Sequence, residues 1–192
     1  MRKATRITTL ASEESMLIAS LTQLTYDAFK QPAPSWLPTL AHAQRQVLNA
    51  LASDRICRVL LDANDNPLGW IAAIPLHHGR IWEIHPLVVA VAEQGKGYGR
   101  VLVREIERLA QQKGVLGLSV GTSDETGATT LYGVDLYQNP LAALAHLQSH
   151  QPHPYEFWIK MGFTVVGVVP DAEGRGKPGI HLAKRIADER IL

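Results

Sequence analysis

The sequence predicts a single α/β domain built on a mixed, mostly antiparallel sheet with helices on both faces. Three observations lead to this prediction. Strand-like and helix-like patterns alternate along 192 residues, a length typical of one domain. Two strand-like runs, at 56–61 and 69–75, flank a turn-forming segment and indicate a hairpin. A long apolar strand at 81–91 leads through a glycine-rich turn into an amphipathic helix.

The remaining elements are predicted by capping residues and side-chain periodicity. Ser12 and Thr39 are suitable N-caps for two helices, and the proline-rich loop between them carries Trp36. An apolar stripe at helical spacing predicts a longer helix that begins at Tyr98 and ends before Gly114. In chain order, the predicted strands are 7–10, 56–61, 69–75, 81–91, 116–120, 163–170 and 180–186, and the predicted helices are 13–29, 40–53, 98–113, 141–147 and 154–162.

The composition is that of an ordinary globular protein, with 46% hydrophobic and 19% charged residues. No run of 18 apolar residues indicates a membrane span, and no apolar segment follows the basic start as in a signal peptide. We therefore expect a cytoplasmic protein without membrane partners. The net charge of +1 does not favour nucleic acid. Cys57, the only cysteine, is interpreted as a small buried hydrophobe rather than a catalytic thiol.

The segment from Gln94 to Arg100 is the most informative part of the chain. Its glycines expose backbone N–H groups at the start of a helix, an arrangement that suits a phosphate. The spacing excludes a Walker A loop, which needs a Lys-Ser/Thr pair, and the dinucleotide fingerprint, which needs glycine at the position of Leu102. Lys96, Arg100 and Arg104 form a stripe that could contact phosphates. The alternatives are a glycine turn without a ligand and a solvated helix face.

Read as Gln-x-x-Gly-x-Gly, the glycine segment resembles the acetyl-CoA loop of the GCN5-related N-acetyltransferases. Further blocks resemble one branch of that family, the aminoglycoside 6′-N-acetyltransferases, and lie at 82–89, 121–125, 129–137, 153–157 and 168–178. The resemblance implies that fold, direct transfer of acetyl from acetyl-CoA to an aminoglycoside in a ternary complex, antibiotic resistance, no metal, and a homodimer. The cofactor-binding residues it implies are Leu87, Val88, Val89, Gln94, Gly95, Lys96, Gly97, Tyr98, Gly99, Arg100 and Trp158.

The strand before the glycine loop carries the expected acid–base groups. Alternation places Glu83, His85 and Leu87 on one face. Glu83 can hold an incoming ammonium and accept its proton, directly or through water, and His85 could do the same. The alternatives are that Glu83 pairs with a basic residue across the sheet and that His85 is structural. The resemblance adds an oxyanion donor, the backbone N–H of Leu87 or Val88.

A polycationic acceptor calls for carboxylates and for a surface that can stack on a sugar. The expected carboxylates are Glu83, Asp124 and Asp135, with Glu125 and Glu156 behind them. Ordinary loop capping is the alternative for the carboxylates of the long loop at 121–140. Trp36 is expected to stack on a sugar ring or, alternatively, to anchor its loop. Ser123 stands where the branch often has a second Asp, so one carboxylate is missing there.

The sequence leaves two alternatives for the protonation of the departing thiolate. In the branch that the chain resembles, the favoured acid is a tyrosine at the position of Trp158. An indole N–H donates a hydrogen bond but does not give up a proton. Tyr155, one helical turn earlier, can stand in for it. Alternatively no acid is needed, because a thiol with a pKa of about 8.5 leaves readily as thiolate.

Two other functions remain compatible with the sequence. The first is an N-acetyltransferase for another small polyamine or for a protein amine, because one fold hosts many substrates. The second is a non-catalytic acyl-CoA sensor, although a sensor needs no ammonium site. The strand at 180–186 alternates well enough to pair with a second copy of the chain, as dimers on this fold do.

Overall fold

A seven-stranded sheet in the order β1-β2-β3-β4-β5-β7-β6 forms the centre of the molecule. The structure, a computed structural model, describes residues 5–187. The strands are β1 (Thr5–Thr9), β2 (Ile56–Asp62), β3 (Pro67–Leu76), β4 (Ile81–Val89), β5 (Gly117–Ser123), β6 (Thr164–Val169) and β7 (Gly179–Arg185). The α-helices are α1 (Ser15–Phe29), α2 (Leu40–Asn49), α3 (Tyr98–Gln112), α4 (Pro140–Ala145) and α5 (Pro154–Lys160), and a 3₁₀ turn, η1, spans Val91–Glu93.

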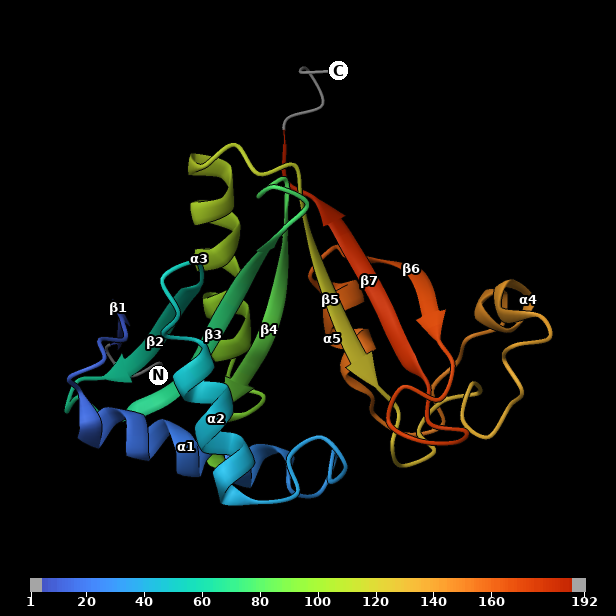
Figure 1. The fold of residues 1–192 in the computed structure, drawn as a ribbon, viewed down its shortest axis with the longest axis horizontal. Coiled ribbons are helices and arrows are strands. Elements are labelled where there is room, and N and C mark those ends of the chain that lie inside the picture. The colour runs from blue at the N-terminus through green and yellow to red at the C-terminus, as the bar shows by residue number, and fades with distance from the viewer. Residues whose placement is uncertain (1–4, 188–192) are drawn as a thin grey trace.

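The pairing of the strands confirms the mixed, mostly antiparallel sheet. Every neighbouring pair is antiparallel except β4 and β5, which run parallel. The long connection between β4 and β5 contains α3, as parallel strands require. Helices α1 and α2 cover one face of the sheet, and α3 and α5 cover the other (Figure 1).

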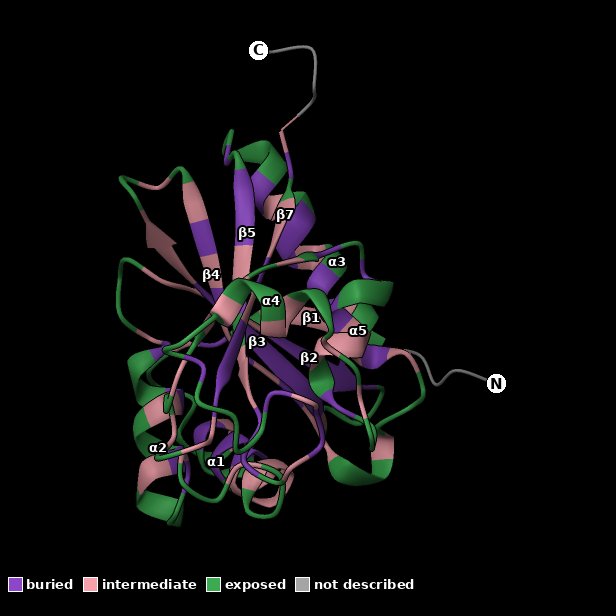
Figure 2. Ribbon diagram, turned by 90° about the vertical axis from the view of Figure 1, so that its right-hand side faces the viewer, coloured by how far each residue is buried: buried purple, intermediate pink, exposed green. Residues whose placement is uncertain are grey.

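Each face of the sheet carries its own apolar core. Leu21 of α1 and Val47 of α2 pack with Trp70 of β3 on one face. Leu102 and Ile106 of α3 pack on the other face with residues from β3, β4, β5 and β7. Buried residues therefore concentrate along the central strands, and exposed residues lie on the outer sides of the helices (Figure 2). No helix within residues 5–187 is long and apolar enough to cross a bilayer.

A β-bulge in β4 changes which side chains share a face. Ile71 of β3 pairs with Leu87, and Ala73 pairs with Ile84, so two residues of β4 lie opposite one of β3. As a result Leu87 packs in the same core as Ile84, on the α3 face. The expectation that Leu87 shares a face with Glu83 and His85 is therefore wrong, because the extra residue shifts the alternation by one position.

Strands β4 and β5 pair only at their beginnings. The paired residues are Ile81–Glu83 of β4 and Gly117–Ser119 of β5. Beyond Glu83 the two strands diverge, while each continues for several residues (Figure 1). The β5-facing backbone edge of β4 therefore has no strand partner from His85 to Val89. An unpaired edge in the middle of a sheet leaves N–H and C=O groups open to a ligand.

The N-termini of α1 and α2 show whether the two predicted N-caps, Ser12 and Thr39, are correct. Thr39 caps α2, and its hydroxyl accepts a hydrogen bond from the backbone N–H of His42 at 3.4 Å. Ser12 is not the cap of α1, which begins at Ser15 after Glu14. The Glu14 carboxylate instead accepts the backbone N–H of Ala11 at 2.7 Å, which satisfies the chain just before the helix. The predicted strand at 81–91 ends early, at Val89, because η1 follows it.

The hydrogen bond between α1 and β3 offers a test of the packing on that face. The indole N–H of Trp70 donates to the hydroxyl of Thr25 at 2.8 Å, and both residues are fully buried. Thr25→Val leaves this donor without a partner, so we expect the free energy of unfolding to fall by about 1–3 kcal/mol. Urea unfolding of the variant and of Thr164→Val, an exposed position in β6, provides the comparison. Equal stability of the two variants would contradict the prediction.

Candidate functional site

The turn between β4 and α3 presents a row of free backbone donors. Gly97 caps α3 in the left-handed conformation with φ of 86°, and Gly95 has φ of 75°. Both values favour glycine. The backbone N–H groups from Gly95 to Arg100 donate to no acceptor within residues 5–187. The side-chain amide of Gln94 donates to the carbonyl of Val89 at 3.2 Å and ties the turn to the strand. This is the geometry of an anion site at a helix start.

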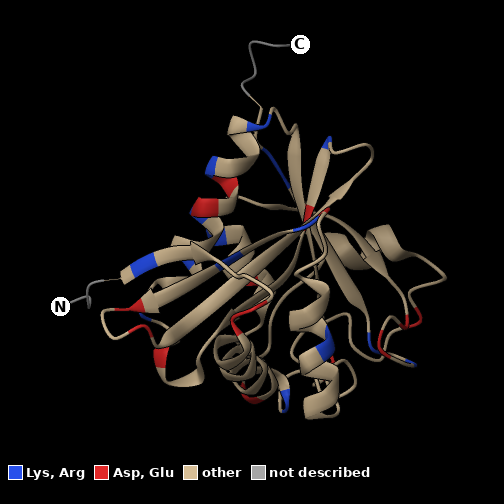
Figure 3. Ribbon diagram, turned by 60° about the vertical axis from the view of Figure 1, so that its left-hand side comes forward, with Lys and Arg blue, Asp and Glu red and all other residues tan. Residues whose placement is uncertain are grey.

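The cations beside this turn differ in their partners. Lys96 pairs with Glu93 at 3.0 Å, and Arg104 pairs with Glu107 of α3 at 3.0 Å. Arg100 is exposed and forms no ion pair within residues 5–187. Basic and acidic residues are interspersed along α3 (Figure 3). Arg100 is therefore the free cation of the predicted stripe, whereas Arg104 belongs to a structural pair of its own helix.

Several predicted cofactor contacts are limited to the backbone. The side chain of Tyr98 is buried in the core of the α3 face, and Val88 is buried in the core of the α1 face. Gly99 lies against α5, where an added Cβ would come 3.4 Å from the ring of Phe157. Tyr98, Val88 and Gly99 can therefore contact a ligand only through their backbone groups, because their side chains, or the absence of one at Gly99, are needed for packing.

Glu83, His85 and Trp36 form one wall of the site, on the α1 face of β4. The cross-strand neighbours of Glu83 are Ile74 and Ser119, and no residue within 5–187 hydrogen-bonds or ion-pairs with its carboxylate. A basic cross-strand partner for Glu83 is therefore not found. The ring centroids of Trp36 and His85 are 5.4 Å apart. Trp36 also contacts Phe29 of α1 at 4.6 Å, so it anchors the proline-rich loop as well as lining this wall.

The ionisation of His85 follows from its surroundings. Burial lowers its pKa, the nearby carboxylate of Glu83 acts in the opposite direction, and the guanidinium of Arg55 lowers it further. The net effect is a pKa below the ordinary value, which favours the neutral imidazole. A neutral ring can accept a hydrogen bond or a proton from an ammonium group placed between His85 and Glu83.

Asp124 is a structural residue, which corrects the expectation that it contacts the acceptor. Its side chain is completely buried. Its two oxygens accept backbone N–H groups from Thr126 at 3.2 Å, Gly127 at 2.9 Å, Ala128 at 2.9 Å and Thr129 at 2.7 Å. Burial raises the pKa of this carboxyl, but the hydrogen bonds outweigh burial and hold the pKa below its ordinary value. The carboxylate shapes the loop after β5 and is not free for an ammonium.

Asp135 also serves a turn. Its carboxylate is exposed and accepts the backbone N–H of Tyr137 at 3.2 Å and the side-chain amide of Gln138 at 3.3 Å. The neighbouring Gly133 donates its backbone N–H to the carbonyl of Gly176 at 2.9 Å, so this loop borders the turn before β7. These hydrogen bonds are those of a loop-capping residue, which was the alternative for Asp135. A contact of Asp135 with the acceptor stays a prediction.

A polar cluster that sequence reasoning did not assemble joins three loops. The Glu125 carboxylate accepts the backbone N–H of Ser35 at 2.9 Å and lies 3.9 Å from the ammonium of Lys177. Glu173 accepts the hydroxyl of Ser123 at 3.3 Å. Glu173 was missed because it lies 50 residues after Ser123 in the chain, and only the pairing of β5 with β7 brings their loops together.

His153 connects α5 to the end of β5. It caps α5, and its Nδ1 accepts the backbone N–H of Tyr155 at 3.3 Å. Its Nε2 lies 3.2 Å from the carbonyl of Ser123, so Nε2 carries the proton and donates. The hydroxyls of Tyr155 and Ser149 are hydrogen-bonded at 3.0 Å. Burial lowers the pKa of His153, although the Ser123 carbonyl and nearby carboxylates oppose it. Glu156 lies in the first turn of α5.

Trp158 is largely a core residue. Its ring packs edge-on against Phe157 and Phe163, each at 5.1 Å between centroids, and only 4% of the residue is exposed. Its indole N–H has no acceptor within residues 5–187, yet it is not among the fully enclosed unpaired atoms there. The N–H is therefore accessible from outside the core and can donate a hydrogen bond there.

Two other kinds of catalytic group, a reactive thiol and a metal centre, can be examined among the residues that the structure describes. Cys57 is buried, and burial raises the pKa of its thiol to about 12. A nucleophilic thiolate is therefore not formed at neutral pH. Within residues 5–187, no three His, Cys, Asp or Glu side chains come together in a way that could hold a metal ion.

Comparisons with known proteins give consistent matches. The profile of the Acetyltransferase (GNAT) family matches residues 18–134. A crystal structure of an aminoglycoside 6′-N-acetyltransferase complexed with coenzyme A is 30% identical, with a TM-score of 0.86 and 96% of this chain and 98% of that chain covered. The aminoglycoside 6′-N-acetyltransferase from Enterococcus faecium is also 30% identical, with a TM-score of 0.82 and the same 96% and 98% covered.

A more distant structure shows how widely the fold is shared. The ribosomal-protein-S18-alanine N-acetyltransferase from Escherichia coli is 15% identical, with a TM-score of 0.64 and 98% of this chain and 99% of that chain covered. At that identity the match shows the fold alone. The search of curated proteins found no match.

The neutral state of His153 predicts how stability depends on pH. Its folded-state pKa is lowered from the ordinary value of 6.5. Between about pH 7.5 and about pH 5 the unfolded chain therefore takes up a proton that the folded protein resists, and stability decreases as the pH falls. His153→Asn keeps an N-capping side chain but cannot titrate. We expect urea unfolding across this range to give a shallower pH slope for the variant, whereas equal slopes would contradict the prediction.

Proposed function

Because the chain belongs to the GNAT acetyltransferase family, we propose that it transfers the acetyl group of acetyl-CoA to the 6′-amine of an aminoglycoside. The observation that carries this proposal is the carboxylate of Glu83, which has no protein partner among the described residues and lies where β4 and β5 separate. Two aminoglycoside 6′-N-acetyltransferase structures at 30% identity and nearly full coverage support the choice of acceptor. Resistance to such drugs would follow from the same reaction.

The residues present fit acetyl-CoA, the cosubstrate of this family. The free backbone N–H groups from Gly95 to Arg100 and the exposed Arg100 guanidinium suit its phosphates. The unpaired edge of β4 from His85 to Val89 offers peptide groups to its amide-bearing arm. Acetyl-CoA supplies an activated thioester, and the chain supplies binding, orientation and proton transfer.

Glu83 and His85 would prepare the amine for reaction. An aminoglycoside amine is protonated near neutral pH, so it must lose a proton before it can attack a thioester. Glu83 is placed to hold the ammonium and to take its proton, directly or through water. The neutral His85 beside it can accept the same hydrogen bond. Positioned proton transfer of this kind typically contributes about 10²–10⁴-fold to a rate.

The backbone of β4 would stabilise the negative charge that develops on the thioester carbonyl oxygen. A peptide N–H on the β5-facing edge, at Leu87 or Val88, has no strand partner there. Removal of one such donor in other enzymes costs about 3 kcal/mol. Because the donor is a peptide group held in a sheet, it needs no reorganisation when the charge appears.

The departing thiolate has two candidate donors. The phenol of Tyr155 is engaged with Ser149 at 3.0 Å, and the indole N–H of Trp158 has no described acceptor. Trp158 can donate a hydrogen bond to a thiolate without giving up its proton. A thiol with a pKa of about 8.5 needs no more than that near neutral pH. We therefore propose that Trp158 hydrogen-bonds to the leaving group and that Tyr155 is the available acid.

The proposal is tested by the thiol released from acetyl-CoA in the presence of aminoglycosides. Kanamycin A carries a 6′-amine and should be acetylated, whereas paromomycin carries a 6′-hydroxyl and should not. Glu83→Gln should lower kcat/KM for kanamycin by about 10²–10⁴-fold with an unchanged KM for acetyl-CoA. Glu13→Gln, an exposed position before α1, is the matched control.

The result can go against this proposal in distinct ways. Release of thiol with spermidine but with no aminoglycoside would indicate a different small-amine acceptor. Tight binding of acetyl-CoA without turnover on any amine would indicate a sensor. Equal acetylation of kanamycin and paromomycin would exclude the 6′ position.

The role of Trp158 can be tested by restoring a phenol. In Trp158→Tyr we expect kcat to be equal to or higher than that of the parent protein, because tyrosine also donates a hydrogen bond and adds a transferable proton. The smaller ring loses packing against Phe163, so thermal unfolding should be recorded with the kinetics. A collapse of kcat in a variant that is still folded would mean that the indole shapes the site in a way that tyrosine cannot replace.

A further inference from the structure

We propose that a hollow beside the β3–β4 hairpin binds a small organic anion, in which a carboxylate is attached to a flat apolar body. The hollow has a volume of about 540 Å³, within the range of about 300–1,000 Å³ that small-molecule sites occupy. We call it the hairpin hollow, and its lining includes Arg55, Ile56, Pro75, His78, Trp82 and Lys113. This inference goes beyond the proposed function, because none of the residues assigned to acetyl-CoA or to the acceptor lines the hollow.

Three segments that are far apart in the chain form the walls of the hairpin hollow. They are the approach to β2, the hairpin between β3 and β4, and the end of α3, which contribute Arg55, His78 and Lys113. The backbone N–H of Leu116 donates to the carbonyl of Arg80 at 2.8 Å and joins the segment after α3 to the hairpin. The walls are therefore held in place by the fold itself, as in most small-molecule sites.

The floor of the hollow carries a hydrogen-bond donor that has no protein acceptor. Only 3% of Trp82 is exposed, and Trp82 lines the hollow. Its indole N–H donates to no group in the described part of the chain, yet it is not among the fully enclosed unpaired atoms there. Trp70, which is fully buried, instead donates to the hydroxyl of Thr25 at 2.8 Å. Because a buried indole N–H usually finds a partner, the N–H of Trp82 calls for an acceptor within the hollow.

Two cations on the rim are also without protein partners. Arg55 is half-buried and Lys113 is exposed, and within residues 5–187 the side chain of neither forms an ion pair or a hydrogen bond. Asp54 lies on the same rim and forms no ion pair with another described residue. Two unpaired cations against one carboxylate leave the rim positive, so it attracts an anion and repels a polycation such as an aminoglycoside.

The tip of the β3–β4 hairpin adds a histidine to the rim. The backbone N–H of Gly79 donates to the carbonyl of Leu76 at 2.9 Å and closes a turn whose central residues, His77 and His78, have φ of 50° and 58°. Positive φ at both positions is typical of a type I′ turn, which favours Asn and Gly. Histidine is strained there, so turn formation alone does not explain it. His78 lines the hollow, and its imidazole can donate a hydrogen bond to an anion.

The apolar residues of the hollow define the rest of the ligand. Ile56, Pro75 and Val115 line it together with Trp82. A bare phosphate or sulfate ion would satisfy the cations but would leave this apolar surface uncovered. An aromatic carboxylate satisfies both, because its ring packs on the apolar lining and its carboxylate accepts hydrogen bonds from the floor and the rim. The lining therefore favours an organic carboxylate over an inorganic anion.

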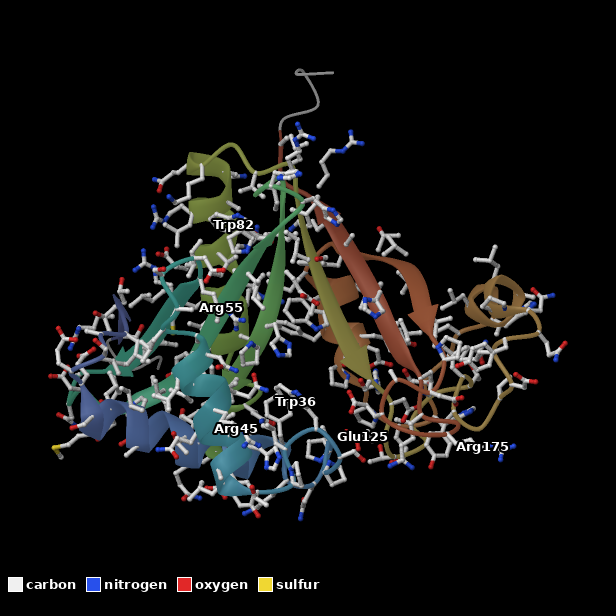
Figure 4. The ribbon with its side chains drawn as sticks, in the orientation of Figure 1. Trp36, Arg45, Arg55, Trp82, Glu125 and Arg175 are labelled. Atoms are coloured by element: carbon white, nitrogen blue, oxygen red, sulfur yellow. The ribbon has the colours of Figure 1, made fainter. Side chains whose placement is uncertain are left out.

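The hairpin hollow is remote from the acceptor side and from the phosphate-binding turn. Figure 4 shows Trp82 beside α3, whereas Trp36 and Glu125 lie toward the opposite end of the sheet. The phosphate-binding turn precedes Tyr98, the first residue of α3, and Lys113 follows the last of its 15 residues. At a rise of about 1.5 Å per residue, this helix is about 22 Å long. One molecule of the protein can therefore hold an anion in the hollow and acetyl-CoA at the same time.

Calorimetry with 2-naphthoate, with and without saturating coenzyme A, tests this inference. We expect one 2-naphthoate per chain with the same Kd in both conditions, and much weaker binding of the neutral 2-naphthamide. Lys113→Gln should raise the Kd about threefold to tenfold, because a cation of the rim is lost. Trp82→Phe should raise it about tenfold, because the aromatic floor stays while its N–H donor is lost.

Lys160→Gln is the matched control for the loss of a lysine. Lys160 is exposed at the end of α5, its side chain has no partner among the described residues, and it does not line the hollow. The variant should therefore bind 2-naphthoate as the parent protein does. Arg55 is left unchanged in this test, because it also lowers the pKa of His85.

Several results would overturn the inference. Absence of 2-naphthoate binding, or equal binding of 2-naphthamide or inorganic phosphate, would exclude the proposed class of ligand. Loss of 2-naphthoate binding with coenzyme A present would place the anion in the cofactor site, and an unchanged Kd in both variants would place it outside the hairpin hollow. Thermal unfolding guards against a folding defect in Trp82→Phe, and Lys113→Gln, at an exposed position, decides the test if that variant does not fold. Because no aminoglycoside is used, the result does not depend on the proposed acetyl transfer.

Discussion

The short parallel pairing of β4 with β5 is the constraint on which the rest of the site depends. The two strands pair from Ile81 to Glu83 and then separate, although both continue. Glu83 is therefore the last residue of β4 that pairs with β5, and on that edge the peptide groups after it face an opening rather than a strand. The cores on the two faces keep the sheet together on either side of this opening. A carboxylate, an unpaired backbone edge and a phosphate-binding turn follow one another along a single strand and its exit.

The proline-rich loop connects the two sides of this opening. Ser35 donates its backbone N–H to Glu125 after β5, and Trp36 packs against His85 in β4. Two adjacent residues thus fix the spacing between walls that share no strand pairing at this level. The contacts of Trp36 agree both with a structural role, as an anchor for its loop, and with a functional role, as a residue that lines the site. Because its contact with Phe29 anchors the ring, Trp36 has a fixed position in the lining of the site.

The sequence predicted the architecture and the phosphate-binding turn, because both depend on local patterns. Glycines at positions that need positive φ are visible in the chain as Gly95 and Gly97. Local patterns did not reveal the bulge in β4, since the extra residue depends on the register with β3, and Leu87 was therefore assigned to the wrong face. Asp124 was expected to be a ligand because an acidic loop looks available in sequence, whereas four backbone donors occupy it. The contact of Glu173 with Ser123 could not be predicted from local patterns, because only the tertiary structure brings these two residues together.

Individual buried charges, rather than the net charge of the chain, determine which groups of a ligand this site attracts. The formal net charge is +1, so the chain as a whole does not attract a polycation. Exposed charges are screened within about 8 Å at physiological ionic strength, but buried carboxylates are screened much less. Glu125 is enclosed, and Glu83 is half-buried. The half-buried carboxylate of Glu83 therefore attracts an ammonium group more strongly than the net charge of the chain does. The buried carboxylate of Glu125 serves a different purpose, because its hydrogen bond from Ser35 holds the proline-rich loop, and with it Trp36, in a fixed position beside His85.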